Sequence, residues 1–163
     1  MTMQVRDKIK YNRQITDFLP TPYLPEDDPR IVYLTNENAP RYSYCWRGYV
    51  ATWELKNKQL FLVKISSAQY KITTNDPIFA DWYTGKLEIP NGKSVTPWGG
   101  DAEMRMHEDE IHITLKNGTV VKTEYIDFKN EISNLGLINK KRYLAMHELN
   151  VKEVREIISQ MNK

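Results

Sequence analysis

The chain has 163 residues, the length of one domain, and its 23 Lys and Arg against 21 Asp and Glu leave a formal charge of +2, too small to direct it to nucleic acid or anionic lipid. Its 40% hydrophobic residues exclude disorder as the main state, and its single cysteine, Cys45, excludes internal disulfides and multi-cysteine zinc sites. No apolar run reaches the roughly 18 to 20 residues of a membrane span, and residues 1–10 lack the apolar region of a signal peptide, so we expect one cytoplasmic domain, residues 1–163, with neither a membrane nor a nucleic-acid partner.

The N-terminal third predicts short strands and one long connection. Residues 8–18 place apolar side chains on both sides of Asn12-Arg13, which indicates a hairpin. Four prolines within residues 20–29 predict an extended connection without ladder hydrogen bonds, because proline lacks the backbone donor. Residues 31–35 are β-branched and aromatic, which favours a brief strand.

Residues 42–66 carry the strongest pattern in the chain. Apolar residues alternate onto one face of a first strand at Tyr49, Ala51, Trp53 and Leu55. After a turn at Asn57-Lys58, the second strand is apolar on both faces, which predicts a central strand covered on both sides. Gly48 predicts a bulge or a close backbone approach.

The second half of the chain predicts weaker strands and a second hairpin. Residues 70–73 favour a strand, 78–83 fit either a strand or a helical turn, and Pro90-Asn91-Gly92 predicts a turn. Residues 111–126 form a hairpin around Lys116-Asn117-Gly118. We favour a three-residue loop there, since that register places Ile113 opposite Val121 on one apolar face.

Near the C-terminus, Asn150 and Glu153 match a capping-box pattern, and apolar residues recur at helical spacing over 151–161. A second short helix is expected near 128–136. The sequence therefore predicts a mainly β fold, an antiparallel curved sheet or small sandwich or barrel of seven to nine strands, with one C-terminal amphipathic helix in an α+β arrangement.

Three segments carry a resemblance to known sequences: DKIKY at 7–11, WRGYVATWELKNKQLFLVKI at 46–65 and FADWYTGKLEIPNG at 79–92. Together they cover roughly the first 95 residues. They resemble a group of uncharacterised bacterial proteins that share RGYxATxEI and ADWxxGxLxIPxG segments. The resemblance implies a family and no activity, substrate or catalytic residue.

Motifs for metal or cofactor chemistry are lacking in the sequence. His107 and His112 lie five residues apart, which on a strand sends them to opposite faces, so we expect no metal site. Neither a phosphate loop nor a dinucleotide fingerprint occurs, so we expect no cofactor. Cys45 lacks the flanking signature of a nucleophile and is expected to be a half-buried thiol.

Asp81 is the one carboxylate with an unusual neighbourhood, because aromatic residues flank it. In an apolar pocket its pKa would rise, which suits acid catalysis or ligand capture. One hypothesis is therefore a small hydrolase-like enzyme in which Asp81 or Glu54 acts with His112, under Trp82 and Trp98. The other interpretation is that Asp81 caps a turn or accepts a hydrogen bond from Arg47.

The favoured hypothesis is a non-enzymatic binding protein for another protein. Exposed aromatic residues beside acidic rims are typical of protein recognition, and an acidic surface favours a basic partner. The expected partner-binding residues are Trp98, Asp101, Glu103, Glu108, Asp109, Tyr42 and Tyr44. Small size and the missing catalytic motifs suit a toxin-neutralising immunity protein or an inhibitor from a mobile element. A small-ligand binding module is a further alternative.

Overall fold

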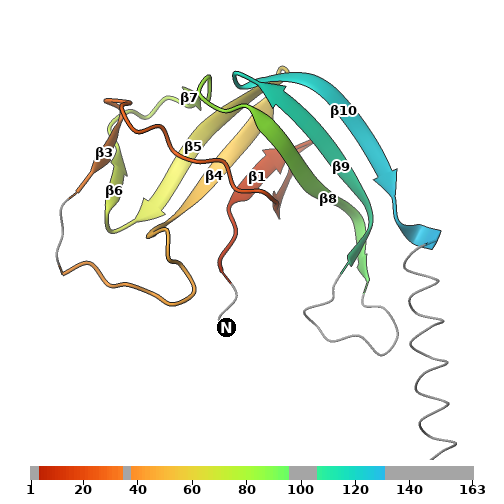
Figure 1. Cartoon of the computed structure of the whole chain (residues 1–163), viewed down its shortest axis with the longest axis horizontal. Coiled ribbons are helices and arrows are strands. Elements are labelled where there is room, and N and C mark those ends of the chain that lie inside the picture. The colour runs from red at the N-terminus through yellow and green to blue at the C-terminus, as the bar shows by residue number, and fades with distance from the viewer. Residues whose placement is uncertain (1–3, 35–37, 96–105, 131–163) are drawn as a thin grey trace, which may run out of the picture. The chain divides into compact units, whose positions relative to one another are not determined.

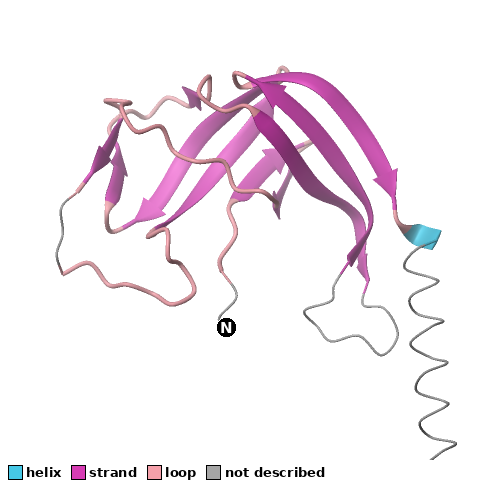
Figure 2. Cartoon of the chain, viewed as in Figure 1, coloured by secondary structure: helices cyan, strands magenta, loops and turns pink. Residues whose placement is uncertain are grey.

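A computed structural model of the chain describes residues 4–34, 38–95 and 106–130. The chain divides into two compact units, and each is described by itself. Unit 1 comprises Met1–Pro90 and Ile111–Ile126, and unit 2 comprises Asn91–Glu110 and Asp127–Lys163. Nearly all regular structure in the described residues is strand (Figure 2), so the mainly β prediction is confirmed.

Ten strands lie in the described residues (Figure 1). They are β1 (Lys8–Tyr11), β2 (Gln14–Asp17), β3 (Ile31–Tyr33), β4 (Tyr49–Lys56), β5 (Gln59–Ser67), β6 (Tyr70–Ile72), β7 (Ile78–Phe79), β8 (Gly85–Val95), β9 (Met106–Lys116) and β10 (Thr119–Asp127). Eight of them form one sheet in the order β2-β1-β4-β5-β10-β9-β8, with β7 paired to β5, and β3 and β6 form a separate pair.

The main sheet is mixed rather than purely antiparallel, which corrects one part of the prediction. Strand β1 runs parallel to β4, with Ile9 opposite Trp53. A parallel pair needs a long connection, and here the proline-rich segment and β3 supply it.

The ladder does not close into a barrel over the described residues. After β2, Leu19 makes a single bridge to Glu88 of β8, the strand at the other end of the order. Two backbone hydrogen bonds of 3.2 and 2.5 Å join the pair. Leu19 directly precedes the proline-rich segment, and residues 20–29 themselves belong to no ladder, as predicted.

Two hairpins have the turns that the sequence predicts. Asn12-Arg13 and Asn57-Lys58 are two-residue loops in which both residues have positive φ, between 48° and 64°. That conformation matches the right-handed twist of the flanking strands. The β4–β5 hairpin forms a long ladder that runs from Tyr49 opposite Ser67 to Lys56 opposite Gln59.

The core of unit 1 lies on the face predicted for β4. Its buried members are Ile9, Phe18, Tyr49, Ala51, Trp53, Leu60, Leu62, Ile78, Ala80, Tyr83, Leu87, Ile89, Ile111, Ile113 and Leu115. Strand β5 is central, with β4 on one edge and β7 and β10 on the other. Its second face is not fully covered, because Val63 is an extra residue in a β-bulge and is 41% exposed.

Two turn predictions in the second half of the chain are wrong. The β9–β10 loop has two residues, Asn117 and Gly118, both with positive φ, instead of three. Ile113 is buried while Val121 is 59% exposed, so they do not share the apolar face that the longer loop required. The twist match of an Asn-Gly turn outweighs the apolar pattern of β10.

The second wrong prediction is the turn at Pro90-Asn91-Gly92. Strand β8 continues through these residues to Val95, and Gly92 takes a φ of 66° within it. The Asn-Gly pair supplies a left-handed residue here without reversing the chain.

The predicted helices over 128–136 and 151–161 lie largely or wholly outside the described residues. The backbone is helical at Lys129 and Asn130, where the description ends. Over the described parts of the chain, no helix has the length and apolar character needed to cross a bilayer.

Candidate functional site

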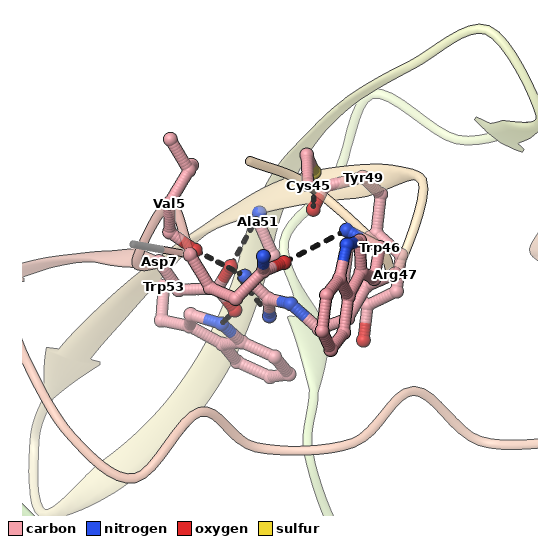
Figure 3. Close-up of polar contacts among 9 residues, drawn as sticks. Val5, Asp7, Cys45, Trp46, Arg47, Tyr49, Ala51 and Trp53 are labelled. Carbon is pink, nitrogen blue, oxygen red and sulfur yellow. Dashed lines mark hydrogen bonds and ion pairs between the residues drawn. The ribbon is translucent and has the colours of Figure 1, made fainter. Parts of the chain in front are cut away.

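A buried carboxylate organises the segment before β4 (Figure 3). Asp7 is 0% exposed and accepts three hydrogen bonds: from the Arg47 guanidinium at 3.0 Å, from the Ala51 backbone N–H at 2.9 Å and from the Trp53 indole N–H at 2.8 Å. A buried charge is tolerated only when it is paired and hydrogen-bonded. Three donors, one of them charged, meet that condition.

The chain on the N-terminal side of Asp7 is tied to residues 43–47 in the same way. The Val5 backbone N–H donates to the Tyr44 carbonyl at 2.7 Å, and the Val5 carbonyl accepts from Arg47 at 2.9 Å. The Gln4 side chain donates to the Ser43 carbonyl and accepts from the Trp46 N–H. Residues 43–47 are thus hydrogen-bonded to residues 4 and 5, which lie about forty positions earlier in the chain.

Arg47 also lies over an aromatic ring, with its guanidinium carbon 5.0 Å from the centre of the Tyr49 ring. Burial raises the pKa of the Tyr49 hydroxyl, against the lowering effect of Arg47. The Cys45 thiol is half-buried, as predicted, and donates to the Tyr49 carbonyl at 3.3 Å. Cys45 and Arg47 are therefore both bonded where the chain enters β4.

Three aromatic side chains project from this loop, which we define as the aromatic loop, residues 38–48. Tyr42 is 49% exposed, Tyr44 44% and Trp46 75%. The rings of Tyr42 and Tyr44 stack with centres 5.0 Å apart. Tyr42 and Tyr44, which the sequence predicts at a surface, are thus exposed, and Trp46 is the most exposed of the three.

A second candidate is a hollow of about 590 Å³ in unit 1, which we call the acidic hollow. Asp81 and Trp82 line it together with the proline-rich segment. Its charged members are Glu26, Asp27, Asp28, Arg30 and Asp81. Four carboxylates against one guanidinium make its surface negative.

The walls of the acidic hollow are held by paired contacts. The Tyr23 hydroxyl donates to the Trp82 carbonyl and the Trp82 indole N–H donates to the Tyr23 carbonyl, both at 2.9 Å. Arg30 binds Asp28 with two hydrogen bonds of 2.8 and 2.6 Å, which hold the pKa of the Asp28 carboxyl below its usual value. Asp28 is thus neutralised, while Asp81 is exposed to solvent.

The hypothetical catalytic group of Asp81, Glu54 and His112 gains no support from this geometry. Asp81 lies in the acidic hollow, whereas Glu54, on β4, forms an ion pair with Lys10 at 3.2 Å. His112 lies on β9 and alternates with the buried Ile111 and Ile113, so it faces away from the core. Arg47, the expected partner of Asp81, binds Asp7 instead.

The predicted acidic surface is only partly described, since Trp98, Asp101 and Glu103 lie outside the described residues. Glu108 and Asp109 belong to β9 and are half-buried, not on an open loop. Within unit 2, a carboxylate oxygen of Asp109 is buried, has no hydrogen-bond partner among the described residues and lies close to Gly92. Of the predicted partner-binding residues, only Tyr42 and Tyr44 are described at an open surface.

Sequence reasoning missed Asp7 and Tyr23. Asp7 stands between Arg6 and Lys8, a setting that favours an exposed acid, and its partners are 40 to 46 residues away. The one signal in the sequence that includes Asp7 is the DKIKY segment, because Asp7 is its first residue and directly precedes the strand.

No protein-family model, curated protein or solved structure matches this chain. The resemblance of its segments to a bacterial group therefore stays a prediction.

Proposed function

We propose that this chain is a binding protein that recognises a macromolecular partner through the aromatic loop. The observation that carries the proposal is an exposed aromatic group on a loop that several hydrogen bonds hold to the N-terminal segment. Trp46 is 75% exposed, yet its own N–H is bonded to Gln4 and the next residue, Arg47, is bonded to Asp7.

This arrangement favours binding for two physical reasons. Tryptophan and tyrosine dominate the binding energy of protein interfaces, because they bury a large area with few rotatable bonds. A loop already held in one conformation also loses less entropy on association. Exposing Trp46 to water without a partner contributes nothing to folding that we can identify.

The toxin-neutralising immunity protein or inhibitor of a mobile element is a narrower form of this proposal. It is supported by the small size of the chain and by the missing catalytic motifs. A basic partner for residues 101–110 belongs to the same hypothesis.

The test is co-purification of the partner from the native host. Tagged wild-type chain and the variants Trp46→Ala and Tyr125→Ala are captured from lysate and analysed by size-exclusion chromatography. Tyr125 is the matched control, since it is an exposed aromatic (71%) on β10. We expect a stoichiometric complex with wild type and the Tyr125 variant, and at least tenfold less with the Trp46 variant. Equal recovery in all three would contradict the proposal.

A small-ligand binding module is the second candidate, and the acidic hollow favours it. Its negative charge and the rings of Tyr23 and Trp82 suit a ligand with a cationic group, since aromatic faces and carboxylates both attract cations. Asp81→Asn would then abolish calorimetrically measured binding of such an amine and leave the partner complex intact. An unchanged titration would remove this candidate.

A further inference from the structure

The aromatic loop has a local charge that differs from that of the chain as a whole. Arg6 and Arg41 are exposed and make no hydrogen bond or ion pair with the described residues. The third arginine in this region, Arg47, is paired with Asp7 at 3.0 Å. Arg6 and Arg41 are therefore two exposed guanidinium groups without an ion pair among the described residues.

Among the described residues of this region, carboxylates do not offset these two charges. Residues 4–6 and 38–48 contain no Asp or Glu, and the adjoining Asp7 is 0% exposed. Lys8, the next cation along the chain, is already bound to Asp17 at 3.0 Å. Over the described residues, the charge around the aromatic loop is positive, unlike that of the acidic hollow.

The position of Arg6 follows from the backbone hydrogen bonds. Val5 is joined to Tyr44 at 2.7 Å, which places the residue after it beside the loop, while Arg41 directly precedes Tyr42. Charges at the rim of an aromatic patch select the partner and raise the association rate through complementarity.

We propose that the aromatic loop binds an acidic protein segment, one that presents carboxylates to Arg6 and Arg41 and an apolar side chain to Trp46. This inference rests on the proposed function and adds the chemistry of the partner. Proteins that bind nucleic acid through phosphates use more cations than two, and Tyr42 and Tyr44 already stack on each other instead of offering open faces. An acidic peptide needs only the two arginines and the open indole.

The test uses the full chain and a random dodecapeptide library displayed on phage. Peptides enriched on wild type are synthesised, and their affinities are measured by fluorescence anisotropy at 50 and 300 mM salt. The variants are Trp46→Ala, Arg6→Glu with Arg41→Glu, and Lys56→Glu with Lys116→Glu. The last pair changes the net charge equally at the far end of β4 and at the β9–β10 turn.

We expect enriched peptides with net negative charge and an aromatic or leucine residue. Their affinity should fall at least tenfold with Trp46→Ala, about tenfold with the double arginine reversal and less than twofold with the lysine control. Raising the salt should weaken wild-type binding and leave the arginine variant nearly unchanged.

The other outcomes separate the two claims. Peptides that need Trp46 but are neutral or basic would overturn the acidic partner and leave the proposed function standing. A dodecathymidylate probe that binds more tightly than the best acidic peptide would also overturn it, in favour of nucleic acid. Absence of any Trp46-dependent enrichment would overturn both claims.

Discussion

Replacing Asp7 tests whether its network holds the aromatic loop and the start of β4 together. In Asp7→Ala, the Ala51 N–H and the Trp53 indole N–H lose their acceptor inside the protein, at about 1 to 3 kcal/mol each. Arg47 also loses its carboxylate, and breaking a buried pair from one side costs about 3 to 5 kcal/mol in all. We therefore expect the free energy of unfolding to fall by about 3 to 5 kcal/mol, a large fraction of the roughly 5 to 15 kcal/mol of a typical domain.

The assay is equilibrium unfolding in urea, followed by circular dichroism and tryptophan fluorescence. Asp17→Asn is the matched control, because its carboxylate binds Lys8 at 3.0 Å but is 54% exposed, and we expect a change below about 0.5 kcal/mol. If the alanine variant is unfolded without urea, the loss of unfolding free energy is measured on Asp7→Asn instead. Its amide oxygen can still accept from Arg47 and Ala51, while its NH₂ group cannot accept from the Trp53 indole. A loss of less than about 1 kcal/mol for Asp7→Ala would refute the reasoning.

Three further predictions concern the core, the turns and the response to pH. Leu62→Ala should lower the free energy of unfolding by about 2 to 5 kcal/mol in urea, because the side chain is 0% exposed, and a loss below about 1 kcal/mol would contradict its burial. Gly118→Ala should lower the urea midpoint more than Gly48→Ala: both have positive φ, but the added Cβ at 118 would lie 2.5 Å from the Ala80 carbonyl oxygen, whereas at 48 it meets only the flexible Gln69 side chain. Burial raises the pKa of Tyr83, so the folded state keeps its proton longer than the unfolded chain; the stability this confers is complete below pH 10 and is lost as the pH rises through the folded pKa. The urea midpoint should therefore decline above pH 10, less steeply in Tyr83→Phe, and identical slopes would argue against the assigned cause.

The sequence predicts the β4–β5 hairpin because its two determinants, the alternation of apolar residues and the turn residues, are local. The alternation of Tyr49, Ala51 and Trp53 and the turn at Asn57 lie within a few residues of the contacts they specify. The same logic fails at Asn117-Gly118, where two local rules disagree. There the turn conformation decides the register and leaves Val121 exposed.

The candidate sites were harder to predict, because their residues meet through the sheet. Only the exposure of Tyr42 and Tyr44 could be predicted from the sequence. Asp7 acquires its role from the parallel pairing of β1 with β4, which no local pattern announces. Likewise, Asp81 meets Asp28 and Arg30 in one hollow only because the proline-rich segment passes beside Trp82.

The parallel pairing of β1 with β4 has a consequence for the order of events during synthesis. A ribosome releases the β1–β2 hairpin before β4, but the groups that Asp7 binds are in residues 47 to 53. Until those residues leave the exit tunnel, β1 lacks its neighbour β4, and Asp7 lacks the positive charge of Arg47. Two-stranded hairpins are marginally stable alone in water. The nascent chain should therefore keep this hairpin available to chaperones until residue 53 has left the exit tunnel.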